Sequence, residues 1–150
     1  MTTQELKAKG RPVLGYDDKT TVKLDFDNTK LKTVKYWAFR VLNFFSLEGF
    51  IILRSSHKCY HVVFNRPVSW TRNLHIIAWA CQQSKHKKLT GWLIFQCIKE
   101  SSTLRVGSKG RKKPPKTVFQ YGFQDREIRS YLSYLKLLKK LEKIRCLEAN

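Results

Sequence analysis

The sequence predicts an α+β fold in which an antiparallel sheet carries helices on one face. Residues 22–28 alternate between apolar and polar side chains, which is typical of a half-buried strand. Residues 28–49 and 71–83 instead place apolar side chains at helical spacing between residues that favour helix ends. Residues 50–56 and 60–68 are predicted to be two further strands, separated by a short turn.

The order of these elements is typical of the ferredoxin-like and RRM-like folds, in which strand, helix, strand, strand, helix and strand follow one another. The apolar run 92–100 is the expected fourth strand, and residues 117–123 are expected to form another short one. In this topology the first and third strands are neighbours at the centre of the sheet. One face of the sheet carries both helices, and the other stays open for nucleic acid.

The chain is expected to have three segments. Residues 1–20 hold glycine and proline with little periodicity, which indicates a flexible N-terminal arm. Residues 21–124 form the RRM-like core domain. Residues 125–150 are predicted to form a long, basic C-terminal helix with a leucine-rich stripe. This helix is expected to pack on the core or to extend it. A stripe wider than the core needs would also suit a homodimer interface.

The charge balance is the strongest indication of function. Lysine and arginine number 30 against 11 acidic residues, which gives a net charge of +19. Such a surplus favours an anionic partner, most simply nucleic acid, and we expect DNA rather than RNA. A membrane surface is the rival anion, but no apolar stretch is long enough to span a bilayer, and no signal-type segment is seen. We therefore expect an intracellular, cytoplasmic protein, in the host cytoplasm if it is viral, with no membrane partner.

Two aspartates and a histidine are the candidate catalytic residues. Asp25 and Asp27 alternate with Leu24 and Phe26, so both aspartates are expected on the open face of the sheet. His61 is expected on the same face of the neighbouring strand, because the larger apolar set of that strand would face the helices. Two carboxylates two residues apart on a strand can hold Mg²⁺ or Mn²⁺, and such ions bridge phosphates in nucleotidyl transfer.

The segments LDFDN (24–28) and SSHKCYH (55–61) resemble the first two motifs of the archaeo-eukaryotic primase superfamily, whose catalytic core is RRM-like. The resemblance covers about residues 22–107. It implies a small plasmid- or virus-type member, of archaeal origin, that acts in replication or repair by metal-assisted nucleotidyl transfer. In that case Asp25 and Asp27 would be the metal ligands, and a nucleoside triphosphate would be a ligand.

The same resemblance implies the residues that bind the nucleotide phosphates: Ser55, Ser56 and His61, with Arg105 in the segment STLRVGSK as a further anchor. The chain departs from the family pattern at the third acidic residue, for which Glu100 is the only candidate between the histidine motif and the C-terminal helix. It also lacks an obvious zinc-binding insertion. The chain is therefore either a reduced catalytic core or a degenerate relative that binds nucleic acid without catalysis.

A second group of residues is expected to contact the nucleic acid. The stretch from 105 to 116 holds six basic residues and no acidic one. Its glycines and prolines permit close approach of the backbone, which favours a phosphate clamp without sequence preference over a plain solvated loop. The lysines of KHKK extend the same patch. The expected contacts are Lys87, Lys88, Lys109, Arg111, Lys112, Lys113 and Lys116.

Three alternatives stay open. A non-catalytic DNA- or RNA-binding module on the same fold needs only the charge and the open sheet. A rolling-circle nuclease would use helical tyrosines such as Tyr131 and Tyr134, but it needs a His-hydrophobic-His metal pair, and YHVVF holds one histidine. The aspartate pair also has a simpler interpretation, as surface charges that neutralise nearby lysine or arginine.

Overall fold

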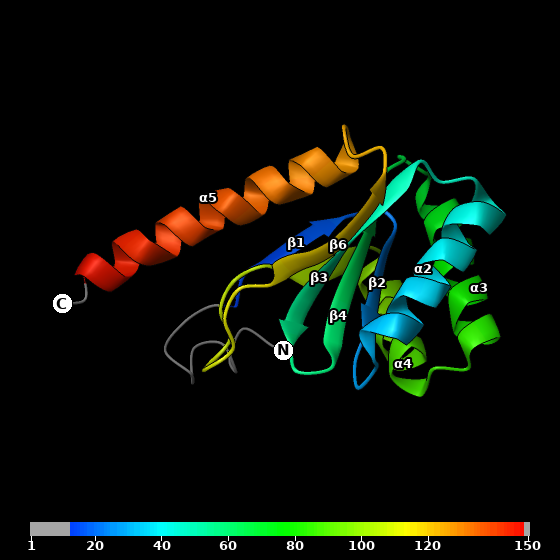
Figure 1. Ribbon diagram of the computed structural model, residues 1–150, viewed down its shortest axis with the longest axis horizontal. Helices are drawn as coiled ribbons and strands as arrows, with labels where there is room; N and C mark the ends of the chain where they lie inside the picture. The colour runs from blue at the N-terminus through cyan, green and yellow to red at the C-terminus, as the bar shows by residue number, and fades with distance from the viewer. Residues whose placement is uncertain (1–12, 149–150) are drawn as a thin grey trace.

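The computed structural model describes residues 13–148, and strands and helices are mixed along this part of the chain (Figure 1). This mixture confirms the predicted α+β class. The strands are β1 (Gly15–Asp18), β2 (Lys23–Phe26), β3 (Gly49–Ser56), β4 (Cys59–Phe64), β5 (Ser102–Arg105) and β6 (Lys116–Gly122). The helices are α2 (Leu31–Phe45), α3 (Trp70–Ser84), α4 (Lys87–Lys99) and α5 (Glu127–Glu148).

The main sheet is antiparallel, with the strand order β2-β4-β3-β6. Its first three strands have the expected ferredoxin-like order, because β4 lies between β2 and β3. The edges differ from the expectation. β6 pairs with the outer side of β3, and β2 is an edge strand rather than a central one. The ribbon formed by β1 and β5 is a separate antiparallel pair, and β5 lies against β2.

The prediction of a strand at 92–100 is wrong, because most of this run belongs to α4. The helix begins after His86, whose Nδ1 accepts a hydrogen bond of 3.1 Å from the backbone N–H of Leu89. This bond satisfies one of the backbone donors that the start of a helix leaves free. A short apolar run cannot be assigned to a strand or a helix from its periodicity alone, and a histidine is an uncommon cap to recognise.

The helices α2, α3 and α4 cover one face of the main sheet (Figure 1). Alternate side chains of β2 and β4 point into this layer, and Leu24, Phe26, Val62 and Phe64 are fully buried there. Full burial of a side chain of this size stabilises the fold by about 1.5–3 kcal/mol. The alternation predicted for both strands is thereby confirmed, and it sends Asp25 to the opposite face.

That opposite face is also covered, which corrects the expectation of an open sheet. Ile51, Leu53 and Val63 point to it and are fully buried. Their partners lie in β5, in the residue after it and in the first half of α5: Leu104, Val106, Ile128, Tyr131, Leu135 and Leu138. The physical reason lies in β3, whose run of apolar residues would expose large side chains to water if either face were open.

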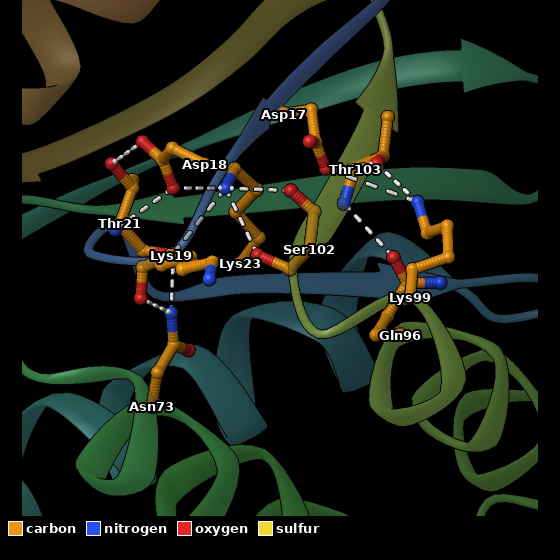
Figure 2. Close-up of polar contacts among 10 residues, drawn as sticks. All are labelled: Asp17, Asp18, Lys19, Thr21, Lys23, Asn73, Gln96, Lys99, Ser102 and Thr103. Atoms are coloured by element: carbon orange, nitrogen blue, oxygen red, sulfur yellow. Dashed lines mark hydrogen bonds and ion pairs between the residues drawn. The ribbon is translucent and has the colours of Figure 1, made fainter.

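Lys23 shows how polar side chains of β2 are accommodated on the covered face. It is fully buried, and Figure 2 shows its Nζ atom among oxygen atoms of the β1–β5 ribbon. Nζ donates to Asp18 Oδ1 at 2.6 Å and to the hydroxyl and carbonyl oxygens of Ser102 at 2.9 and 3.0 Å. Burial lowers the pKa of Lys23, and the Asp18 carboxylate opposes this shift. The ribbon therefore supplies the partners that a buried ammonium needs.

The expectation of a flexible arm up to residue 20 does not hold for Gly15–Asp18, which form β1. Residues 1–12 of the expected arm lie outside the described residues. The connection from β1 to β2 is fixed by side chains, as Figure 2 shows. Asp18 Oδ1 accepts a hydrogen bond of 3.0 Å from the backbone N–H of Thr21, and Asn73 Nδ2 donates to the Thr21 carbonyl oxygen at 2.9 Å. This segment is thus held on both sides.

Candidate nucleic-acid interface

A groove of about 1120 Å³ lies between the end of the β3–β4 hairpin, the segment that leads into β6, and α5. We call it the basic groove. Its basic lining residues are Arg54, Lys112, Lys113, Lys116, Lys139 and Lys143. Its other polar lining residues are Ser55, Ser56, His57 and Glu142. Glu142 is thus the one carboxylate among six cationic side chains in the described lining.

Strand pairing and helix periodicity bring these cations together. Arg54 on β3 is the register partner of Lys116 on β6. Lys139 and Lys143 are four residues apart on α5, so they share one face of the helix. Like charges at neighbouring positions are unfavourable by themselves, and an anion between them would relieve that repulsion.

The basic loop, residues 107–115, contributes the remaining cations. Lys109 and Lys112 exchange backbone hydrogen bonds of 3.0 and 2.9 Å, which close a tight turn. Gly110 sits in this turn with φ of 59°, a left-handed conformation that glycine adopts without strain. The turn fixes the backbone that leads to Lys112, and Lys112 and Lys113 lie in the lining of the basic groove.

Arg105 at the end of β5 fastens the basic loop to the sheet. Its Nη1 donates to the carbonyl oxygens of Gly107 and Lys113 at 2.6 and 3.0 Å. Its Nη2 donates to the carbonyl oxygen of Ser55 at 2.6 Å. Burial lowers the pKa of Arg105, and the Asp25 carboxylate opposes this shift. The residue expected to anchor a nucleotide thus holds the loop that lines the groove.

Asp25 and His61 form the centre of a second polar cluster, on the sheet face that α5 covers. They are register partners on β2 and β4, which are neighbouring strands, as expected. Asp25 Oδ1 lies 3.7 Å from His61 Nε2. The Asp25 side chain is 23% exposed and that of His61 is 5% exposed. The predicted juxtaposition on one sheet face is therefore present, but the face is not open to solvent.

Burial sets the protonation of this pair. Desolvation, followed by repulsion from Asp27, raises the pKa of Asp25 to about 7. Desolvation, followed by the nearby Arg105 charge, lowers the pKa of His61 to about 3. His61 is therefore neutral at pH 7, while Asp25 is divided between its two forms. The two groups are therefore at most a weak ion pair, because the imidazole carries no charge where the carboxylate is ionised.

Tyr131 of α5 is the third member of this cluster. Its side chain is fully buried, and burial together with the Asp25 charge raises the pKa of its phenol. Asp25 Oδ1, His61 Nδ1 and the Tyr131 hydroxyl each lack a hydrogen-bond partner among the described residues. Buried polar atoms without partners are rare in folded proteins, and they often mark a bound water, an ion or a functional site.

The structure separates the residues that were expected to act together. Ser55 and Ser56 lie at the basic groove, whereas His61 faces the buried cluster. The Lys112, Lys113 and Lys116 side chains line the groove, while Lys109 and Arg111 lie in the turn of the basic loop and are not in the lining. Lys87 and Lys88 start α4, which packs on the other face of the sheet, so they do not extend the groove.

Sequence reasoning missed several lining residues, among them the basic residues and the histidine Arg54, His57, Lys139 and Lys143, and the carboxylate of Glu142. The two lysines carried a usable signal, since their spacing places them on one face of a basic helix. No local signal indicated that α5 would lie beside the β3–β4 hairpin, because that depends on long-range packing. His57 lies in the turn of the β3–β4 hairpin, where it is exposed and lines the groove.

Comparisons of the chain with protein-family models, with curated proteins and with solved structures found no match. Among residues 13–148, no helix is long and apolar enough to cross a membrane. In the same residues, no group of three or more histidine, cysteine, aspartate or glutamate side chains gathers in a way that could hold a metal ion.

Proposed function

We propose that this protein binds nucleic acid along its sugar-phosphate backbone in the basic groove. The observation that carries the proposal is the convergence of six cationic side chains from β3, β6, the basic loop and α5 on one groove. Phosphates are regularly spaced anions, and a groove with cations on several walls can contact more than one of them. The net charge of +19 adds a long-range attraction that speeds encounter with such a polyanion.

The groove cations are not neutralised by the protein itself. Within the described part of the chain, the ion pairs shorter than 4.0 Å join Lys23 to Asp18, His61 to Asp25 and Lys99 to Asp17. None of these pairs includes a cation of the basic groove. A surface lysine held in an ion pair has to break that pair before it can bind a phosphate. The groove lysines make no such pair with the described residues, so they can bind a phosphate directly.

The chemistry of the lining favours backbone contacts over base recognition. It holds lysine, arginine, serine and one histidine, and the lining residues include no phenylalanine, tyrosine or tryptophan. Lysine and serine side chains bind phosphate oxygens and carry no sequence information in doing so. Stacking on bases requires exposed aromatic rings in the binding site. We therefore propose binding without strong sequence preference.

Charge reversal on the two sides of the sheet tests this proposal. Lys112→Glu/Lys113→Glu changes the groove, and Lys87→Glu/Lys88→Glu changes the start of α4 by the same net charge. Fluorescence anisotropy with a labelled oligothymidine should show at least a tenfold loss of affinity for the groove variant, since two phosphate contacts become repulsive. The α4 variant should lose much less. Equal losses would mean that only the net charge matters and that the groove is not the binding site.

A second candidate function is the metal-assisted nucleotidyl transfer that the primase resemblance implies. The observation in its favour is the register pairing of Asp25 with His61, with Arg105 close to both. Asp25 and Asp27 offer carboxylate oxygens, and Asp25 Oδ1 has no hydrogen-bond partner among the described residues. Two carboxylates fit Mg²⁺ or Mn²⁺ when water and substrate phosphates supply the remaining ligands. Bound there, the ion would offset triphosphate charge and activate a 3′ hydroxyl.

This second function also requires α5 to move, because Tyr131 covers the face that holds Asp25. Calorimetric titration of Mn²⁺ and Mg²⁺, with and without a nucleoside triphosphate, tests it. The wild type should bind metal and nucleotide together, and Asp25→Ala/Asp27→Ala should lose that binding while remaining folded. If wild type and variant behave alike, the aspartates are structural and the protein is a binding module.

A further inference from the structure

Glu142 is out of place in a groove built to attract anions. It is the one carboxylate in the described lining, and it lies on α5 between Lys139 and Lys143 in sequence. Its position is fixed by hydrogen bonds to the basic loop rather than by these lysines. Oε1 accepts from the backbone N–H of Ser108 at 2.8 Å, and Oε2 accepts from the Ser108 hydroxyl at 2.9 Å.

These two bonds form a two-point anion site. One backbone donor and one hydroxyl donor of the same residue contact the two oxygens of one carboxylate, and such charge-assisted bonds are about twice as strong as neutral ones. A Cβ added at Gly107 would lie 2.8 Å from Glu142 Oε1, so the absence of a side chain there leaves the approach to Ser108 open. A phosphate also presents two oxygens of similar spacing to a pair of donors.

The surroundings of this site favour more negative charge than one carboxylate supplies. Lys112, Lys113, Lys139 and Lys143 line the same groove. Arg105, which binds the Gly107 carbonyl oxygen at 2.6 Å, also feels the charge of Glu142. Coulomb attraction to several cations is larger for a phosphodiester that can reach the lysines than for a carboxylate tethered to α5. A phosphate can therefore compete with Glu142 for Ser108.

We propose that Ser108 is a phosphate subsite of the basic groove and that Glu142 occupies it in the free protein as an internal competitor. This inference rests on the proposed binding of nucleic acid in the groove, and it names the donors that receive one phosphate. Nucleic acid displaces the carboxylate from Ser108, so part of the binding energy is spent on breaking the Glu142 contacts. Glu142 thereby lowers the affinity of the groove for nucleic acid. When nucleic acid binds, the contact between α5 and the basic loop at Ser108 is broken.

A double-mutant cycle tests the subsite. Glu142→Gln keeps the shape of the side chain and one acceptor oxygen, but its bonds to Ser108 become neutral and weaker. We expect this variant to bind oligothymidine about tenfold more tightly, because the internal competitor is weakened. Glu100→Gln makes the same change of charge at the exposed C-terminal end of α4, and we expect less than about a twofold effect from it.

Ser108→Ala separates the proposed subsite from a general effect of charge. In the wild-type background its effect should be small, because the hydroxyl is already occupied by Glu142. In the Glu142→Gln background it should remove most of the gain, because the hydroxyl is then a phosphate donor. Thermal unfolding followed by circular dichroism checks that all four proteins of the cycle are folded.

Each outcome decides between the two proposals. If Glu142→Gln and Glu100→Gln raise affinity by the same factor, the effect is one of net charge and the subsite is excluded. An additive cycle, in which Ser108→Ala has the same effect in both backgrounds, excludes it as well. In both cases wild-type binding still supports the groove. If the wild type and every variant fail to bind oligothymidine, the proposed function fails and the subsite fails with it.

Discussion

Asp25 on β2 and His61 on β4 are register partners, and 3.7 Å separates Asp25 Oδ1 from His61 Nε2 on a sheet face that α5 covers. Burial acts on the two groups in opposite directions. It raises the pKa of the carboxyl to about 7 and lowers the pKa of the imidazole to about 3. Each group therefore makes a contribution to the free energy of unfolding that depends on pH. The two contributions change with pH in opposite directions.

The Asp25 contribution can be isolated with Asp25→Asn. The pKa of Asp25 rises from 3.8 to about 7 on folding, so the folded state binds the proton more tightly. The stability from this group is full below pH 3.8 and is lost as pH rises through about 7. Asp25→Asn should match the wild type near pH 4 and exceed it above pH 7, by about 4 kcal/mol, since each unit of pKa corresponds to about 1.4 kcal/mol. Urea denaturation between these pH values measures the difference, and a constant difference would contradict the raised pKa.

The His61 contribution has the opposite slope. Its pKa falls from 6.5 to about 3 on folding, so the unfolded state binds the proton more tightly. Stability from the neutral ring is full above pH 6.5 and is lost as pH falls toward 3. His61→Asn should therefore gain on the wild type as the solution becomes more acidic. The pH ranges in which Asp25 and His61 change the stability overlap, and the two changes oppose each other. The stability of the wild type alone would therefore vary little with pH through these two groups.

The buried ammonium of Lys23 makes Asp18 a key residue for stability. Lys23 is fully buried, and its Nζ lies 2.6 Å from Asp18 Oδ1. Asp18→Ala leaves the charge without its carboxylate and should cost about 3–5 kcal/mol. Lys23→Met/Asp18→Ala removes both charges and should be more stable than Asp18→Ala alone. Urea midpoints of the three proteins give the comparison, and a double variant less stable than Asp18→Ala would contradict it.

The Tyr131 hydroxyl is buried without a hydrogen-bond partner among the described residues. Tyr131→Phe removes this group and keeps the ring that packs against Tyr16, so stability should be unchanged or higher by about 1 kcal/mol. Tyr131→Ala should cost about 3–5 kcal/mol through the cavity it creates. Phe at this position should also leave binding of oligothymidine unchanged. Loss of a DNA-cleaving activity in Tyr131→Phe would instead support the rolling-circle nuclease, to which the burial of this hydroxyl gives no support.

Arg105 should control the order of the basic loop. Its guanidinium donates to three backbone carbonyl oxygens, on Gly107, Lys113 and Ser55. Arg105→Met removes these bonds, so hydrogen exchange should become faster at the amides of residues 107–113. Arg66→Met is a matched control, because Arg66 binds the Ser46 carbonyl oxygen in another part of the chain. Unchanged exchange in the loop of Arg105→Met would show that other contacts hold it.

Some features of this site could be predicted from the sequence because they depend on strand alternation alone. A period of two places Asp25 on the sheet face opposite to that of Leu24 and Phe26. The same period in β4 places His61 on the face opposite to that of Val62. The order of the elements was enough to make β2 and β4 neighbours. Local pattern and topology together are therefore enough to predict that Asp25 and His61 share one face of the sheet.

Other features depended on contacts between distant segments. The polar residues Lys23 and Asp25 suggested a face in water, but the β1–β5 ribbon supplies partners for Lys23. The unbroken apolar run of β3 indicates that the second face is also covered, because Ile51 and Leu53 lie on that face and would otherwise be exposed to water. The docking of α5 beside the β3–β4 hairpin had no local signal. For that reason the groove, which α5 helps to build, could not be predicted.

The salt dependence of oligothymidine binding tests the central claim most directly, because it reports how many phosphates the groove neutralises. The logarithm of the binding constant should fall linearly with the logarithm of salt concentration. Lys112→Glu/Lys113→Glu should flatten this slope by about 1.4, since each lost contact with a single strand contributes about 0.7. Lys87→Glu/Lys88→Glu should leave the slope close to that of the wild type. An unchanged slope in the groove variant, or an equal change in both variants, would contradict binding in the basic groove.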